Sequence, residues 1–177
     1  SQIEDVRTCS CRISEYELGN SLETEADCRA AHRRTPENLT ARETGLEGFQ
    51  DSINMDSDAV SPDFHFHMEV ARAPGNRHFA DLMTYLGTMI IPRTRVNTAH
   101  SAPEGRLNYL QRVHGEHESI YNAIRDQDAE AARAAMRTHL ANSRERLRRG
   151  NNAHTLQALE EQTPAQALQA IGKNMVA

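Results

Sequence analysis

The sequence predicts an all-α fold. Its segments are rich in charged residues and alanine, and apolar residues recur in them at the spacings of an amphipathic helix. Alternating runs of β-branched and aromatic residues bounded by Asn-Gly or Asp-Gly turns, which would indicate β-hairpins, are missing. The length of 177 residues is enough for one compact domain with its own core.

Composition narrows the possible functions. A net charge of −5, a pI near 6.0 and the lack of a long basic run argue against a broad contact with nucleic-acid phosphates. A mean hydropathy of −0.71 and the lack of a long apolar run argue against a membrane span, and the N-terminus does not resemble a signal peptide. The odd set of Cys9, Cys11 and Cys28 suits a reducing cytoplasm. Cys9 and Cys11 could bind a metal, but without a second thiol pair nearby we expect ordinary reduced cysteines.

Two helices are expected in the first third of the chain. The first should run from about Ser14 into the segment CRAAHRR. Thr35 is then an N-cap residue, and Pro36 suits the first position of a second helix. The buried stripe of this second helix would consist of Leu39, Leu46, Phe49 and Ile53. The polar stretch INMDSDAVS that follows predicts a loop.

A third helix is expected between two clear boundary signals. Ser61 and Pro62 again suit an N-cap and a first-turn proline, and the segment 74–76, Pro-Gly-Asn, is a stop signal. His67 lies on the apolar face of this helix, and His65 points away from that face. Asp63 shares the face of His67 one turn earlier, although an aspartate in a first turn is also favoured by the helix dipole as a solvated capping residue. The apolar face would consist of Phe64, His67, Met68 and Ala71.

The remaining helices follow from their apolar stripes. One helix should end near Ile91 and Pro92, before the loop NTAHSAPEGR. Its buried stripe would consist of Phe79, Leu82, Met83, Leu86 and Ile90. The next helix should end at the acidic turn 126–128. Its buried stripe would consist of Leu110, Val113, His117, Ile120, Tyr121 and Ile124. A further helix should bury a third stripe: Ala132, Ala135, Met136, His139, Leu140 and Leu147. Beyond Gly150, the segments 155–162 and 163–174 predict two short helices in an accessory tail over residues 151–177.

Three separate helices thus each place a histidine on a buried face. A single histidine in such a place is most often a core residue that is hydrogen-bonded to a backbone carbonyl, but three unsatisfied ones would each cost ~1–3 kcal/mol. One shared divalent cation would satisfy all of them. The candidate ligands are Asp63, His67, His117 and His139, a set of nitrogen and oxygen donors that suits Zn, Ni, Mn, Fe or Co better than calcium or copper(I). Open positions on such an ion could hold a carboxylate effector or an activated water.

Two runs of the sequence resemble a known family at these residues. DFHFHMEVARAPGNRHFADL and the more specific GEHESIYNAIRDQDAEAARAAMRTHL are similar to the C-terminal effector-binding (FCD) domain of the FadR subfamily of GntR-type bacterial transcription regulators. The resemblance extends from about Glu15 to Arg149, which suggests a domain over residues 12–150. It implies an antiparallel bundle of six to seven helices, usually dimeric, with a central pocket for small carboxylic acids. In many members a divalent metal is held there, and the matching positions are the same Asp63, His67, His117 and His139, with zinc as the first expectation.

The sequence departs from the family pattern in two ways. Members normally carry an N-terminal winged helix-turn-helix, and this chain begins where that DNA-binding module would end. The first helix of the family usually contains E-x-R-x-x-L-E, whereas this chain has ELGNSLE, with Gly19 at the position of the arginine. A glycine inside a helix also weakens it by ~1 kcal/mol. Either the effector contact from that arginine is lost here, or the register of the motif slips locally.

The sequence therefore predicts a sensory domain, not an enzyme. A small organic acid, such as a sugar acid or hydroxy acid, would bind the metal and shift a homodimer that controls DNA binding through the absent domain. Arg93, Arg95 and Arg106 are candidates for pairing with its carboxylate, although solvated surface arginines are commoner. Two alternatives stay open. One is a metalloenzyme with Glu116 or His114 as its base, and the other is a closed structural metal site.

Overall fold

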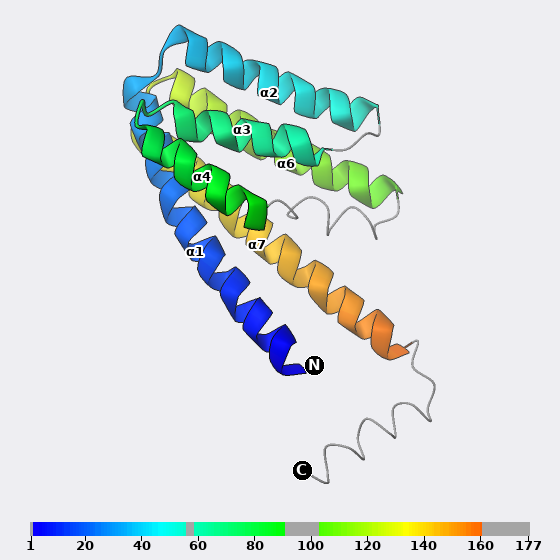
Figure 1. Ribbon diagram of the computed structural model, residues 1–177. Coiled ribbons are helices and arrows are strands. Elements are labelled where there is room, and N and C mark those ends of the chain that lie inside the picture. Colours follow the sequence, from blue (N-terminus) through cyan, green and yellow to red (C-terminus); the bar gives the residue numbers. More distant parts are fainter. Residues whose placement is uncertain (1, 56–58, 91–102, 161–177) are drawn as a thin grey trace.

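The computed structural model of the protein describes residues 2–55, 59–90 and 103–160 (Figure 1). These residues form helices and no strand, so the predicted all-α fold is confirmed. The helices are α1 (Gln2–Arg33), α2 (Pro36–Asn54), α3 (Val60–Arg72), α4 (Arg77–Ile90), α6 (Pro103–Arg125) and α7 (Ala129–Glu160). None of them combines the length and the apolarity needed to cross a bilayer.

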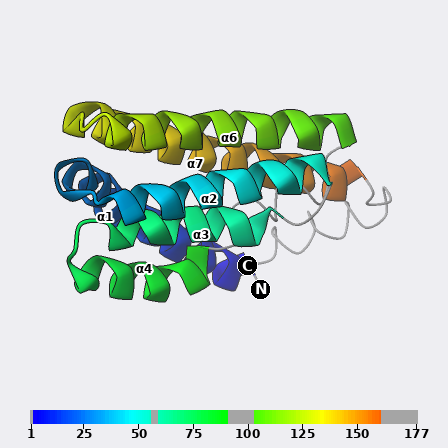
Figure 2. The ribbon, with the colours of Figure 1, turned by 90° about the horizontal axis from the view of Figure 1, so that it is seen from above.

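The helices form a layered antiparallel bundle. The long helices α1 and α7 pack against each other, and α6 packs on the other side of α7 (Figures 1 and 2). Helix α2 contacts both α3 and α6, whereas the main contacts of α4 among the described helices are with α1 and α3, at the edge of the bundle. The interior between α1, α3, α6 and α7 is therefore enclosed by helices, and it is there that the predicted histidine faces converge.

Capping explains why α2 begins where it does. The Thr35 side chain accepts a hydrogen bond from the backbone N–H of Asn38 at 3.3 Å, and the Asn38 side chain accepts one from the backbone N–H of Thr35 at 3.1 Å. This reciprocal pair satisfies two N–H groups that the first turn leaves without helical partners, and Pro36 occupies the first turn as predicted.

Helix α3 begins two residues earlier than predicted, at Val60 and not at Pro62. Ala59 precedes the helix and makes no side-chain cap, and Ser61 lies inside the first turn. A proline is tolerated anywhere in a first turn because its missing N–H would have no helical partner there, so Pro62 does not mark the start to within a residue. The predicted stop is confirmed, since α3 ends at Arg72 and Gly75 has a φ of 70°.

The long helices also extend further than predicted. Helix α1 begins at Gln2 and not near Ser14, because residues 2–13 contain no proline or glycine that would break it. Helix α7 continues through Gly150 to Glu160, since a glycine weakens a helix without having to end it. The first predicted tail helix is thus largely part of α7, and the second lies outside the described residues.

The turn between α6 and α7 follows the prediction. Gln127 adopts a φ of 60°, and the Asp128 side chain accepts a hydrogen bond from the backbone N–H of Ala131 at 2.9 Å. The chain therefore reverses within a few residues, which brings α6 and α7 side by side and places His117 opposite His139.

Among the side chains that the structure describes, those of the predicted apolar stripes are buried or half-buried, except for Leu82. The largest buried cluster joins side chains of α1, α2, α3, α6 and α7, among them Ala30, Phe66, Ile120, Ile124, Met136 and Leu140. On α4, Met83 and Leu86 are buried, but Leu82 is 47% exposed and was wrongly predicted as core. Tyr85 on the same face of α4 is 63% exposed. The reason is the edge position of α4, which buries only one side against α1 and α3.

Candidate metal centre

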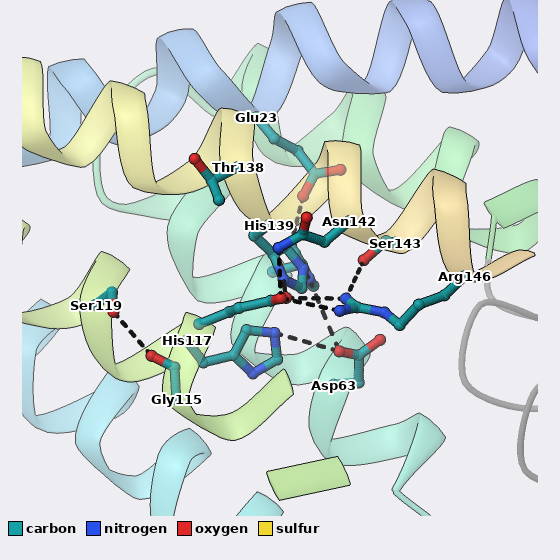
Figure 3. Close-up of polar contacts among 12 residues, drawn as sticks. Glu23, Asp63, Gly115, His117, Ser119, Thr138, His139, Asn142, Ser143 and Arg146 are labelled. Atoms are coloured by element: carbon teal, nitrogen blue, oxygen red, sulfur yellow. Dashed lines mark hydrogen bonds and ion pairs between the residues drawn. The ribbon is translucent and has the colours of Figure 1, made fainter. Parts of the chain in front are cut away.

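Three histidine rings meet in the interior of the bundle. His67 of α3, His117 of α6 and His139 of α7 are 4%, 0% and 2% exposed (Figure 3). One ring nitrogen from each lies within 4.8 Å of the other two. The spacing of apolar residues in the sequence thus predicted which three of the nine histidines lie together. The exposed His65 points away from them, as predicted.

Asp63 lies at the edge of this histidine cluster. Its Oδ1 is 3.4 Å from Nε2 of His117 and 3.9 Å from Nε2 of His67. The aspartate is only 8% exposed, so it is not a solvated capping residue. All four predicted ligands therefore surround a common space.

Two carboxylates hold the histidines in place: Glu23, which the sequence did not single out, and Glu116, which it suggested only as a base. Oε2 of Glu23, on α1, is in ion-pair contact with Nδ1 of His67, and Glu23 is almost completely buried. Oε2 of Glu116, on α6, lies 2.8 Å from Nδ1 of His139. A carboxylate beside Nδ1 favours the tautomer that carries its proton there, which leaves the lone pair on Nε2.

The two Nε2 atoms face each other. Nε2 of His67 and Nε2 of His139 are 3.2 Å apart, and in the favoured tautomers both present a lone pair. Two lone pairs at this distance repel each other unless a proton or a metal ion lies between or beside them. A cation that both nitrogens bind would turn this repulsion into attraction.

The third ring has the properties of a metal ligand as well. Both ring nitrogens of His117 lack a hydrogen-bond partner among the described residues. Burial, reinforced by the neighbouring His139 and His67, holds the pKa of His117 well below its usual value, and burial also lowers the pKa of His139. These imidazoles are therefore neutral, as metal coordination requires. Neutral nitrogens next to the Asp63 carboxylate form a donor set that fits a divalent transition metal.

Glu116 is held by several donors at once. Its oxygens accept hydrogen bonds from Nη1 and Nη2 of Arg146 at 2.9 and 2.8 Å, and from Asn142 at 2.8 Å. Burial alone would raise the pKa of Glu116, but the hydrogen bonds from Arg146 and His139 outweigh it and lower this pKa to about 2. Such a weak proton acceptor does not suit the role of general base that the metalloenzyme alternative gave it.

The other candidate base, His114, contacts residues outside the cluster. His114 has Nε2 3.7 Å from Oε1 of Glu118, and its ring stacks on Phe49 with centroids 6.1 Å apart. Of the two candidate bases, Glu116 is thus beside the cluster but held by Arg146 and His139, and His114 faces Glu118 and Phe49.

Of the three predicted arginines, only Arg106 lies in the described part of the chain. Arg93 and Arg95 lie outside the described residues. Arg106 is half-buried in the first turn of α6, about 16 Å along the helix axis from His117. The arginine that does reach the cluster is Arg146, in a basic run of α7 whose sequence resembles a solvated helix face.

Two further positions complete the comparison with the sequence. Gly19 is buried inside α1, one turn before Glu23. Cys28 is a free, buried cysteine, whereas the side chains of Cys9 and Cys11 lie outside the described part of the chain.

Comparison with known proteins identifies the family. A family model described as FCD domain matches residues 16–142. The chain belongs to the FCD domain family. The resemblance carried by the two histidine-containing runs is thereby confirmed, and the match contains Glu23 and all four predicted ligands but not Arg146.

The relatives of this FCD domain are named as transcription regulators. The chain is 31% identical over 127 residues to the HTH-type transcriptional regulator LutR of Bacillus subtilis, an alignment that covers 71% of this chain and 57% of LutR. It is 30% identical over 112 residues to the HTH-type transcriptional repressor NanR of Klebsiella aerogenes, covering 63% of this chain and 41% of NanR. The chain thus spans about half the length of the relatives it matches.

A solved structure has the same fold. The structure titled Streptococcus agalactiae GntR superimposes with a TM-score of 0.63 at 21% identity, and the match covers 78% of this chain and 60% of that one. This similarity supports the arrangement of the helices described above.

Proposed function

We propose that this FCD domain is the sensory part of a GntR-type regulator of the FadR subfamily. A small organic acid binds at a divalent metal ion in the histidine cluster and alters DNA binding through a separate N-terminal winged helix-turn-helix. Membership of the FCD family and relatives named as transcription regulators support the regulatory role. The same relatives favour a binding protein over an enzyme.

The observation that carries the proposal is the pair of facing Nε2 atoms, 3.2 Å apart, on His67 and His139. His117 and Asp63 would complete the ligand set. Zinc is our first expectation, with nickel, manganese, iron and cobalt as alternatives. The ion would supply positive charge and exchangeable coordination positions for a carboxylate.

The residues of the chain prepare the site for this ion. Glu23 and Glu116 orient the rings of His67 and His139 and keep their Nε2 lone pairs available. The ring of Phe66 stacks on His117, with centroids 4.2 Å apart, and shields one face of it from water. A ligand set held in this way loses little entropy on binding the ion.

The charges of the site also imply that an acid needs the metal. Asp63, Glu23 and Glu116 place three carboxyl groups around the cluster. Without a metal ion, this environment repels an anionic effector, because the guanidinium of Arg146 offsets only one of the three carboxyl charges. Metal binding must therefore precede or accompany acid binding.

A homodimer is part of the proposal. Leu82 and Tyr85, three residues apart on α4, are exposed on the same face, and Leu18 of α1 is 55% exposed. Exposed apolar side chains of this kind suit a contact between two copies. Effector binding inside the bundle would then change the relative position of the two copies.

A thermal-shift experiment tests the proposal. Purified protein is stripped with a chelator, loaded with zinc, and mixed with acetate, glycolate, malate, gluconate or citrate. We expect at least one acid to raise the unfolding temperature by several degrees in the zinc-loaded protein only, and we expect His117→Ala to abolish this response. His65→Ala, on the exposed face of α3, serves as the control.

The other outcomes are equally informative. Zinc that stabilises the protein without any further shift from the acids would indicate a closed structural site and contradict the sensor. A protein that retains no divalent metal by elemental analysis would contradict the metal site itself.

A further inference from the structure

Arg146 reaches the histidine cluster from α7. It lies two turns beyond His139 on the same helix, and its side chain is 17% exposed. Its Nη2 donates to Oε2 of Glu116 at 2.8 Å, the same oxygen that faces Nδ1 of His139. Figure 3 shows the guanidinium entering the cluster from the side opposite to the α6 backbone that carries His117. The carboxylate of Glu116 thus links Arg146 to the predicted metal ligand His139.

The guanidinium has hydrogen-bonding capacity to spare. Of its five N–H groups, three are directed at Glu116 and at Ser143, whose Oγ lies 3.0 Å from Nη2. Nε of Arg146 is buried and has no hydrogen-bond partner among the described residues. A buried donor without an acceptor is costly, so this N–H indicates a place for a further acceptor.

The surroundings hold the arginine in position. The guanidinium lies over the ring of Tyr109, 5.3 Å from its centroid. Its charge interacts with the charges of both Glu116 and Asp63. An arginine fixed on one edge by Glu116, with the Nε–H left over, is prepared to receive a second anion.

We propose that Arg146 binds the carboxylate of the effector through its free Nε–H, while Glu116 holds the terminal nitrogens. This inference rests on the proposed function, because it concerns the acid that binds at the metal. It assigns to Arg146 the pairing role that the sequence suggested for Arg93, Arg95 or Arg106. The recognised group is a carboxylate that reaches from the histidine cluster toward α7.

The competing explanation is purely structural. Arg146 could act only through Glu116, by fixing the carboxylate that orients His139. The two roles differ in what they affect. A positioning role changes metal affinity, whereas a binding role changes acid affinity beyond any change in metal affinity.

Two affinities measured on matched variants separate these roles. Zinc affinity is measured by competition with a chromophoric chelator, and affinity for acetate, glycolate, malate, gluconate and citrate by titration of the zinc-loaded protein. The variants are Arg146→Gln, Arg146→Lys and Glu116→Gln. Arg144→Gln, an exposed arginine of the same helix, removes the same charge and serves as the control. Circular dichroism verifies the fold of each variant.

We expect Arg146→Gln to weaken zinc binding less than Glu116→Gln does, and to weaken binding of the acids by about a further tenfold to a hundredfold. Arg146→Lys should lie between the wild type and Arg146→Gln because it keeps the charge but loses the fixed N–H geometry. Glu116→Gln should weaken zinc binding, and Arg144→Gln should change neither affinity.

Three results would count against the inference, and they are distinguishable. Acid affinity like that of the wild type in Arg146→Gln overturns the inference alone. A loss of zinc affinity in Arg146→Gln equal to that in Glu116→Gln, with acid affinity reduced only in proportion, assigns the positioning role instead. If the zinc-loaded wild type binds none of the acids, the proposed function fails, and the inference fails with it.

Discussion

Nε2 of His67 and Nε2 of His139 lie 3.2 Å apart, although the two residues are on different helices and far apart in the sequence. Each ring is held on its other nitrogen by a carboxylate, Glu23 for His67 and Glu116 for His139. The contact is therefore the product of four side chains from four places in the chain. Single substitutions of these residues should therefore change the zinc affinity or the free energy of unfolding.

The first prediction concerns Glu23. Glu23→Gln should lower zinc affinity about tenfold to a hundredfold, because an amide orients the His67 ring less strongly and no longer enriches the tautomer with a free Nε2. Competition with a chromophoric chelator measures this affinity. Glu47→Gln, an exposed carboxylate of α2, is the matched control. Equal zinc affinity in both variants would remove Glu23 from the site.

The second prediction concerns pH. The pKa values of His117 and His139 are lowered in the folded protein, whereas unfolded histidines titrate near ~6.5. Below that value the unfolded chain binds protons that the folded chain excludes, so acidification should destabilise the metal-free protein and stability should rise from about pH 5 to about pH 7. Urea unfolding in the presence of a chelator measures this slope.

A variant without one of these rings tests the source of the slope. His117→Leu should have a flatter dependence of unfolding free energy on pH over the same range. His78→Ala, an exposed histidine of α4, should keep the slope of the wild type. Parallel curves for all three proteins would assign the pH dependence to other groups.

The third prediction concerns a buried pair between α1 and α2. Asp27 and Arg42 are both completely buried, and neither oxygen of Asp27 has a hydrogen-bond partner among the described residues. Burial raises the pKa of Asp27 to about 8 despite the charge of Arg42. Asp27 is therefore mostly protonated at pH 7, so Asp27→Ala should cost about 1–3 kcal/mol, as for a small buried polar group, and less than the loss of one partner of a buried ion pair.

The double variant separates pairing from packing. Asp27→Ala with Arg42→Leu also removes the buried guanidinium and should be neutral or more stable than the wild type by about 1–4 kcal/mol. Urea unfolding gives both free energies. A double variant as unstable as Asp27→Ala would mean that the aliphatic part of Arg42, and not its charge, supports the fold.

The fourth prediction concerns the turn between α6 and α7. Gln127 is exposed and has a φ of 60°, a left-handed conformation that glycine adopts without strain. Gln127→Gly should raise the free energy of unfolding by about 0.5–1 kcal/mol, a net gain after the added flexibility of the unfolded chain. Gln111→Gly, in the middle of α6 and also exposed, should instead destabilise by about 1 kcal/mol. The same sign for both substitutions would contradict this explanation.

Helical periodicity was sufficient to predict the fold and the histidine cluster. His67, His117 and His139 each interrupt an otherwise apolar stripe, and in an all-α domain such stripes have only one interior to share. The spacing of Asp63 and His67 places both on one face for the same reason. The start of α3 at Val60 and the unbroken course of α7 were missed, because proline and glycine signals limit a helix only loosely.

The supporting charges could not be predicted in the same way. Glu23 stands in the run LETEAD and Arg146 in RERLRRG, and each run resembles an exposed polar face. Asp27 and Arg42 are equally ordinary in the sequence. These residues become buried only because α1, α2 and α7 pack closely enough to cover polar faces. That packing is a property of the assembled bundle and not of any single helix.

The unbroken course of α7 has a mechanical consequence. His139 and Arg146 sit on one stiff rod whose far end at Glu160 is about 30 Å from His139, a distance set by the helical rise. A tilt of roughly 5° about His139 would displace that end by about 3 Å over such a length. Under the proposed function, a small tilt of α7 around a bound acid would therefore move the far end of the helix by several ångströms and change its contact with a second copy of the chain.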